Sequence, residues 1–159
     1  MERILKLLSE NAKLTNRQIA AMVGASEEEV AAQIAQFEKE GVIKGYKALI
    51  DWDKTDRELV TAIIELRVTP KQNQGFEEIA KTIMDFREVD SVYLMSGGFD
   101  LAVIVKGKTF QDIAMFVAYR LSPLESVLST ATHFILRKYK ERGVNFSDGE
   151  DDERRITTL

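Results

Sequence analysis

The sequence contains no cysteine, only one histidine and no long apolar run. Without cysteine the chain forms no disulfide and holds no cysteine-ligated zinc or iron–sulfur site. No apolar run approaches the roughly 20 residues that a bilayer span needs. The opening run MERILKLLSENAK carries charge through its apolar positions, unlike a signal peptide. These absences favour a globular protein of the cytoplasm with no membrane partner.

Catalytic signatures are also missing. No stretch resembles a Ser/His/Asp triad, a phosphate loop or a metal-ligand cluster, so we predict no catalytic residue, no metal site and no cofactor. The single histidine, His133, lies in an alternating strand pattern and is predicted to be packed or interfacial. Tyr46, Trp52 and Phe99 are predicted to be core or interface aromatics.

Excess basic charge is the third absence. The net charge is -4, and residues 1–50 hold seven basic and seven acidic side chains. The last 13 residues, 147–159, hold two basic and five acidic side chains, so most of the negative charge lies there. A neutral amino-terminal segment is unusual for a DNA-binding module, because phosphate neutralisation supplies much of the affinity for DNA.

Residues 15–46 are nevertheless the most informative stretch. They are predicted to form two short helices across a tight turn at Gly24, the second of which ends at Gly41 and leads into an extended segment. This order predicts a helix-turn-helix followed by a wing, an arrangement that fits the DNA major groove.

Two capping boxes define the starts of these helices. Thr15 precedes Gln18 by three residues, and Ser26 precedes Glu29 by three residues. A further helix, ending near Asn11, is predicted before them.

The remainder alternates between strands and helices in the order βαββαβ over residues 59–138, after a strand at 46–52 that links two domains. This order predicts a ferredoxin-like sheet with both helices on one face. The fold class is therefore α+β. The predicted divisions are a winged helix-turn-helix at 1–45, a linking strand and turn at 46–58, the ferredoxin-like domain at 59–143 and an acidic tail at 144–159.

Such a sheet leaves its second face uncovered. The apolar residues on that face have nothing in this chain to cover them, and a partner subunit is the simplest cover. We therefore expect a homodimer.

The architecture resembles the Lrp/AsnC family, the feast/famine transcriptional regulators. The run EKEGVIKGYKALID is similar to the family's helix-to-wing junction, and SGGFDLAVIVKG is similar to its glycine-aspartate turn between the second and third strands. The resemblance covers about residues 1–143. It implies a regulator that binds double-stranded DNA, and a carboxy-terminal domain that binds amino acids or related small molecules and assembles dimers or higher rings.

The recognition helix departs from the family. Glutamines stand where basic residues are common, in the run AQIAQF, and three glutamates crowd the start of the helix. Glutamine pairs bidentately with adenine in the major groove, so we predict base contacts by Gln33 and Gln36. A solvated polar face is the alternative. Phosphate contacts are predicted for Arg17, Lys44 and Lys47. Ser26 is a further predicted DNA-binding residue.

The glycine-aspartate turn is the predicted effector site. Gly97 and Gly98 allow backbone N–H groups to approach a carboxylate, and Asp100 would hold an amino group. The alternative is a β-turn in which the glycines serve geometry alone. Three further polar residues are predicted to line the same pocket: Ser96, Thr130 and Thr132.

These features predict a DNA-binding transcriptional regulator, not an enzyme, that responds to an amino acid or a related small molecule. Two alternatives stay open. One is a small-molecule-binding oligomer whose DNA contacts have weakened. The other is a sirohaem decarboxylase, because some relatives with this two-domain architecture catalyse that reaction and use histidine at the tetrapyrrole site, where His133 is the one candidate.

Overall fold

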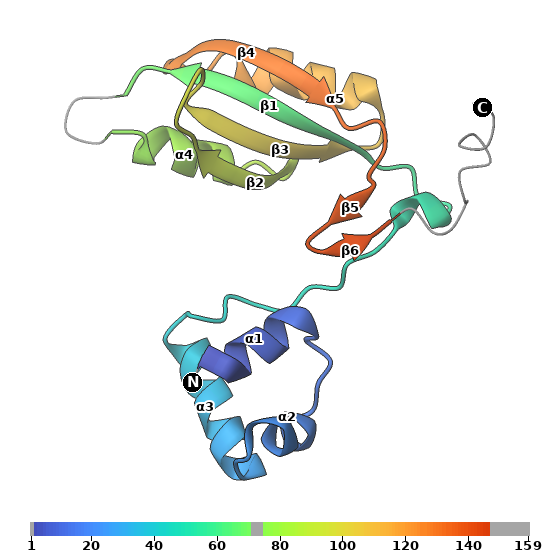
Figure 1. Cartoon of the computed structure of the whole chain (residues 1–159). Coiled ribbons are helices and arrows are strands. Elements are labelled where there is room, and N and C mark those ends of the chain that lie inside the picture. The colour runs from blue at the N-terminus through green and yellow to red at the C-terminus, as the bar shows by residue number, and fades with distance from the viewer. Residues whose placement is uncertain (1, 71–74, 147–159) are drawn as a thin grey trace, which may run out of the picture. The chain divides into compact units, whose positions relative to one another are not determined.

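The computed structural model describes residues 2–70 and 75–146 and divides the chain into two compact units, residues 1–50 and residues 51–159 (Figure 1). Within the described ranges, no helix is long and apolar enough to cross a membrane.

The first unit consists of three helices. They are α1 (Glu2–Glu10), α2 (Asn16–Val23) and α3 (Glu27–Lys39). Their apolar faces meet in a small core, which confirms the helical spacing of the sequence. Four residues are buried in it: Ile4, Ile19, Ala20 and Val30.

A local motif ends α3. Gly41 adopts a positive φ of 69°, and the amides of Gly41 and Val42 donate to the carbonyls of Glu38 and Phe37, at 3.1 and 2.9 Å. This is the Schellman arrangement, which satisfies the last carbonyls of a helix. The predicted end of the helix at Gly41 is confirmed.

The strand predicted at residues 46–52 is not formed among the described residues of the single chain. Residues 44–51 form no strand, and a short 3-10 helix, η1 (Trp52–Lys54), follows them. An extended segment becomes a strand only when a neighbour pairs with its backbone groups, and no described residue pairs with this segment.

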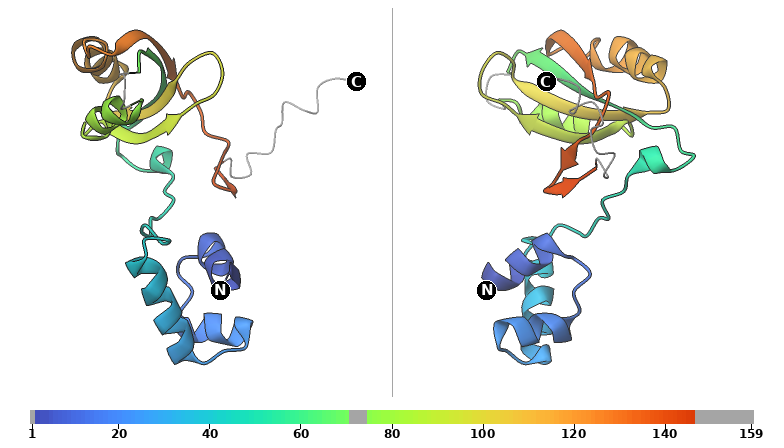
Figure 2. Two further views of the ribbon diagram at one scale, coloured as in Figure 1. Left: turned by 90° about the vertical axis from the view of Figure 1, so that its left-hand side faces the viewer. Right: turned by 45° about the vertical axis from the view of Figure 1, so that its right-hand side comes forward.

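The second unit contains a four-stranded antiparallel sheet with two helices. In chain order these are β1 (Val60–Val68), α4 (Glu77–Met84), β2 (Val89–Leu94), β3 (Leu101–Gly107), α5 (Phe110–Phe116) and β4 (Val127–Phe134). The spatial order is β2-β3-β1-β4, and both helices cover the same face (Figure 2). The predicted ferredoxin-like βαββαβ fold is confirmed.

The core of this unit lies between the sheet and its helices. Along β1, alternate residues are buried, from Ala62 to Val68, and they pack on Ile83 of α4 and Ile113 of α5. The alternation follows from the two-residue period of a strand, which sends every second side chain to the same face.

The end of the chain differs from the prediction. The last strand ends at Phe134, because β1 begins at Val60 and leaves little backbone to pair with beyond that point. A two-stranded hairpin follows, formed by β5 (Lys140–Glu141) and β6 (Val144–Asn145). The predicted acidic tail therefore begins inside a hairpin, and its residues 147–159 lie outside the described residues. The helix α5 continues as a π-helical turn, η2 (Val117–Leu121).

Candidate nucleic-acid interface and effector site

Both predicted capping boxes are present in the helix-turn-helix. The Thr15 hydroxyl accepts from the Gln18 amide, and the Ser26 hydroxyl accepts from the Glu29 amide, both at 3.2 Å. Gly24 separates the two helices with a φ of 73°. Because each cap satisfies otherwise unpaired amides, the turn and the start of α3 are defined by residues close in sequence.

The two glutamines predicted to read bases lie on α3 in different environments. Gln36 is exposed, and its Nε2 donates to Glu40 Oε1 at 2.8 Å. Gln33 is half-buried and forms no hydrogen bond among the described residues. The bond to Glu40 leaves Gln36 with its carbonyl oxygen and one N–H, the two groups that a bidentate adenine contact uses.

Acidic side chains occupy the start of α3. Glu27, Glu28 and Glu29 are exposed in its first turn. A hydrogen bond from the Ser26 amide, and a second from its hydroxyl, lower the pKa of Glu29 from its ordinary value of 4.5. The carboxylates favour the helix dipole but repel phosphates that approach this end of the helix.

The predicted phosphate contacts are accessible. Arg17, Lys44 and Lys47 are exposed and form no ion pair among the described residues. A Cβ added at Gly41 would lie 2.9 Å from Lys44 Nζ, so Lys44 folds back over the end of α3. The hydroxyl of Ser26 already accepts a capping bond, so its presence in the sequence has a sufficient structural reason.

A contact after α3 has no signal in the sequence. Tyr46 is half-exposed, and its hydroxyl donates to Glu38 Oε1 at 2.9 Å. Desolvation, followed by the hydrogen bond to Glu38, raises the pKa of Tyr46 above its ordinary value of 10.0. A tyrosine eight residues from a glutamate has no periodic signal in the sequence, and only the reversal of the chain at Gly41 brings the two together.

The glycine-aspartate turn connects β2 to β3. Gly97 has a φ of 124°, a conformation that favours glycine. A Cβ at Gly98 would meet nothing within 4 Å, so the chain itself gives no steric reason for glycine there. Asp100 Oδ2 accepts from the Val68 amide at 2.9 Å, where the register of β1 shifts. One oxygen of Asp100 is therefore structural.

The other predicted effector residues are only partly brought together. Ser96 is exposed in the turn. Thr130 and Thr132 lie on β4 opposite Leu66 and Ile64, whose side chains are fully buried, so both threonines face the helix layer. The Thr130 hydroxyl lies 3.4 Å from the Ser122 hydroxyl.

His133 is an exposed side chain, whereas the predicted core or interface aromatics Trp52 and Phe99 are partly covered. His133 is exposed on the uncovered sheet face, and its Nε2 lies 3.4 Å from Glu65 Oε1. Trp52 and Phe99 are half-buried. The described residues contain no group of three or more His, Asp or Glu side chains that would hold a metal.

This arrangement defines a class of protein: a regulator in which a helix-turn-helix is joined to a ligand-binding α+β domain. Residues 2–44 match the winged helix-turn-helix DNA-binding domain, and residues 61–144 match the Lrp/AsnC ligand binding domain. The chain belongs to the Lrp/AsnC family of transcriptional regulators.

Relatives support this assignment over the whole chain. An HTH-type transcriptional regulator of Bacillus subtilis, YugG, is 49% identical over 98% of this chain and 94% of its own length. The leucine-responsive regulatory protein of Haemophilus influenzae is 27% identical over 87% of this chain and 83% of its own length. Curated relatives of this chain are thus named as regulators.

Solved structures show the same fold. A transcriptional regulator of Neisseria meningitidis, in complex with L-Met, has a TM-score of 0.71 and 23% identity, covering 87% of this chain and 89% of its own. Escherichia coli AsnC has a TM-score of 0.68 and 16% identity, covering 89% and 93%. At these identities the likeness concerns the fold alone.

Proposed function

We propose that this protein binds a roughly palindromic DNA site as a homodimer or larger ring and that an amino acid or a related small molecule controls this binding. It acts in the cytoplasm and is not an enzyme. One observation carries the proposal: the same chain contains a helix-turn-helix, with capping boxes at the starts of α2 and α3, and the Lrp/AsnC ligand binding domain.

Base reading is assigned to Gln33 and Gln36, and phosphate binding to Arg17, Lys44 and Lys47. Support comes from the exposure of the three cations and from the hydrogen-bonding groups that Gln36 keeps free. Ser26, which caps α3, is a further candidate DNA contact at the start of that helix.

The effector-binding site is assigned to the turn at Gly97, Gly98 and Asp100. Further candidate contacts are Ser96, Thr130 and Thr132. Gly98 supports the assignment, because open space where a Cβ would lie lets a ligand approach the backbone. The free oxygen of Asp100 suits an ammonium group. The L-Met complex of the Neisseria meningitidis regulator supports an amino acid as the class of ligand.

A gel shift with the DNA upstream of the protein's own gene, at low and moderate salt, tests DNA binding. We expect Gln33→Ala to lower affinity for the cognate site more than affinity for random DNA, and Lys44→Ala to weaken both about equally. If Gln33→Ala and Gln36→Ala both leave cognate binding unchanged, this helix face does not read bases, and an oligomer with weakened DNA binding becomes the better description.

Calorimetry with a panel of amino acids tests the effector. Asp100→Asn is the informative variant, because it keeps an acceptor for the Val68 amide and loses the charge. We expect wild type to bind at least one amino acid and Asp100→Asn to bind it more weakly. If wild type binds none of them, the turn serves geometry alone.

A further inference from the structure

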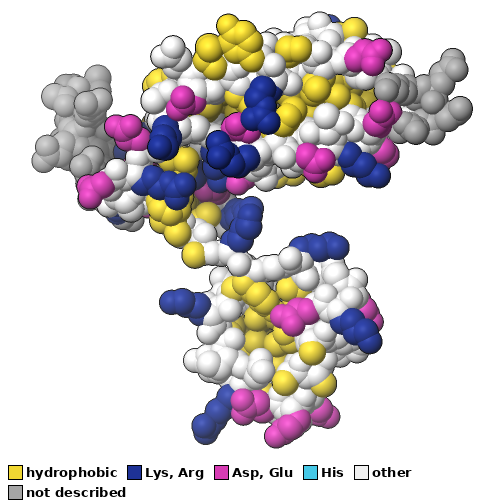
Figure 3. Space-filling model, turned by 180° about the vertical axis from the view of Figure 1, so that it is seen from behind, with side chains coloured by type: hydrophobic (Ala, Val, Ile, Leu, Met, Phe, Trp, Pro, Cys, Tyr) yellow, Lys and Arg dark blue, Asp and Glu magenta, His cyan; other side chains and the backbone are white. Residues whose placement is uncertain are grey.

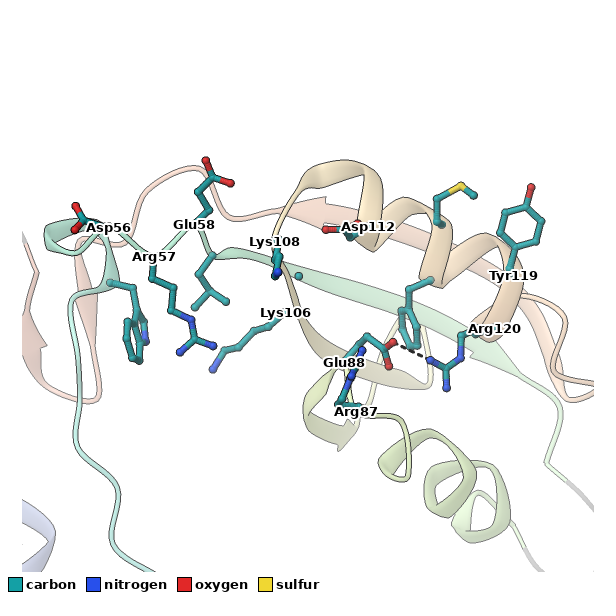
Figure 4. A pocket seen from close by; sticks show the side chains of 15 residues that line it. Asp56, Arg57, Glu58, Arg87, Glu88, Lys106, Lys108, Asp112, Tyr119 and Arg120 are labelled. Atoms are coloured by element: carbon teal, nitrogen blue, oxygen red, sulfur yellow. Dashed lines mark hydrogen bonds and ion pairs between the residues drawn. The ribbon is translucent and has the colours of Figure 1, made fainter.

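A groove in the second unit lies at the opposite end of β3 from the glycine-aspartate turn. The turn precedes Leu101, whereas the groove is lined by residues that follow or flank Gly107 at the other end of the strand. Four segments form its walls: residues 52–59, the chain entering β2, the end of β3, and α5 with η2 (Figure 4).

Two of the basic side chains in the groove are held by carboxylates. Arg120 Nη1 donates to Glu88 Oε1 at 2.8 Å, and Lys106 Nζ donates to Asp90 Oδ1 at 2.7 Å. The Arg120 guanidinium also lies over the Phe86 ring, at 4.6 Å from its centroid. These two cations are therefore fixed by the fold and largely neutralised.

Three further cations line the groove and form no ion pair among the described residues: Arg57, Arg87 and Lys108. Figure 4 shows that the carboxylates of Asp56 and Glu58 point away from the Arg57 guanidinium. Basic side chains in the lining outnumber acidic ones by five to four, and an anion would pair with the cations that have no partner.

One side of the groove is apolar and aromatic. Met115, Phe116 and Tyr119 line it from the helix, and Tyr119 is 70% exposed. At the other end, the Arg57 guanidinium lies 4.6 Å from the centroid of the Trp52 ring, which orients the cation. Figure 3 shows Lys and Arg side chains gathered beside hydrophobic ones on the left of the view of this domain.

We propose that this groove is a second ligand site, which binds a small organic anion with a carboxylate or phosphate head on an aromatic or branched apolar body. The anionic head binds Arg87 and Lys108, with Arg57 at the edge, because guanidinium and ammonium groups form strong charge-assisted hydrogen bonds with either anion. The body packs on the side formed by Met115, Phe116 and Tyr119. The site does not depend on the amino-acid site, which lies at the other end of the strand.

Trp52 makes the test specific, because it is the only tryptophan of the chain and lies in the groove. The probes are 3-phenylpropionate, phenyl phosphate and the neutral 3-phenylpropanol, titrated into the full-length protein while Trp52 fluorescence and binding heat are followed. We expect at least one of the two anions to bind and to change the fluorescence, and the neutral alcohol to bind much more weakly. The tighter anion identifies the preferred head group.

The groove variant carries both Arg87→Ala and Lys108→Ala. The matched control variant carries both Lys81→Ala and Lys140→Ala, which remove two exposed cations outside the groove. We expect the groove variant to raise the anion's Kd by about tenfold or more, since even one lost hydrogen bond to a charged group has an effect of that size. The control variant should bind like wild type. Thermal unfolding of both variants verifies that the fold is intact.

Several outcomes would overturn the proposal. One is that neither anion binds. Another is that the alcohol binds as tightly as the anions, which would make the contact purely apolar. A third is an equal loss of affinity in the control variant, which would indicate a non-specific charge effect. The amino-acid proposal is tested separately, by calorimetry on wild type and Asp100→Asn. A failure of one proposal can therefore be told apart from a failure of the other.

Discussion

At Asp100 a single side chain serves geometry and is a candidate for ligand binding. One oxygen accepts from the Val68 amide, 32 residues away, and the amide of Asp100 donates to the Leu66 carbonyl at 2.8 Å. The residue therefore joins the start of β3 to the end of β1. If Asp100 only bound ligand, as the sequence suggested, removing its side chain would not change the stability of the fold. The bond that the side chain accepts from the Val68 amide predicts a loss of stability.

We therefore expect Asp100→Ala to lower the free energy of unfolding of the second unit by about 1–3 kcal/mol, because the part-buried Val68 amide loses its acceptor. Asp100→Asn retains an oxygen and should lose less. Urea unfolding followed by Trp52 fluorescence, at one fixed protein concentration, measures both. Equal stability of Asp100→Ala and wild type would show that the bond contributes nothing.

Among the secondary-structure elements, α3 combines a stabilising capping box with negative charge in its first turn. Ser26 and Glu29 satisfy each other's amides, while the glutamates of the first turn present negative charge where DNA phosphates would lie. The same few residues thus stabilise the helix and place negative charge at its start.

Two substitutions separate these effects. Ser26→Ala removes the cap and should cost about 0.5–2 kcal/mol in the stability of the first unit. Ser26→Asp keeps a good capping residue, so stability should be retained, but its added charge should weaken DNA binding. Urea unfolding followed by NMR signals of α3, together with gel shifts, provides both readings. Unchanged DNA affinity in Ser26→Asp would place the helix start away from phosphate.

The pH dependence of this cap follows from Glu29. Its pKa is lowered in the folded protein, so its charged form contributes stability above the ordinary value of 4.5, and that contribution is lost as the pH falls below 4.5 through the folded value. Glu29→Gln keeps the capping pattern without the charge. The stability gap between wild type and this variant should narrow below pH 4.5, and a gap independent of pH would contradict the assignment.

At the scale of the whole molecule, one sheet face lies open. Ile63, Ile104 and Tyr93 lie on the side of the sheet that neither α4 nor α5 covers, and Tyr93 is 53% exposed. Exposed Leu49 and Ile50, just before η1, add apolar surface to the segment predicted to pair as a strand. Burial of such surface, at about 25 cal/mol per Å², favours self-association.

We expect sedimentation to show a dimer or larger ring at micromolar concentration. Ile63→Glu should raise the dissociation constant by about tenfold or more, since it places an unpaired charge in the buried interface. Thr82→Glu, exposed on α4, is the control and should leave assembly unchanged. A stable wild-type monomer at that concentration would exclude this interface.

The sparse basic charge of the first unit sets the salt dependence of DNA binding. A dimer that uses Arg17, Lys44 and Lys47 from each subunit neutralises about six phosphates, which gives a slope of log affinity against log salt of about -5. Lys44→Ala removes two contacts per dimer and should make the slope shallower by about 2. Filter binding at a series of salt concentrations measures both slopes. A wild-type slope much steeper than about -5 would indicate phosphate contacts beyond the helix-turn-helix.

Features built from neighbouring residues follow from the sequence alone. Capping boxes act over three residues, and the positive φ at Gly24 ends a helix locally, so the helix-turn-helix was predictable from spacing. The alternation of strands and helices likewise predicted the ferredoxin-like sheet, because few topologies accept that order. The residues of the two candidate sites were named from the same local signals.

Contacts between residues distant in the chain depend on the folded structure. The sequence placed Asp100 in a ligand turn, but its bond to Val68 depends on the pairing of strands. Arg57, Arg87 and Lys108 read as scattered surface charge, and the fold brings them into one groove. The strand predicted at 46–52 is not formed in the single chain for the same reason, since pairing needs a partner strand that the local sequence does not specify. Local hydrogen bonds are encoded in spacing, whereas long-range contacts exist only once the chain has folded.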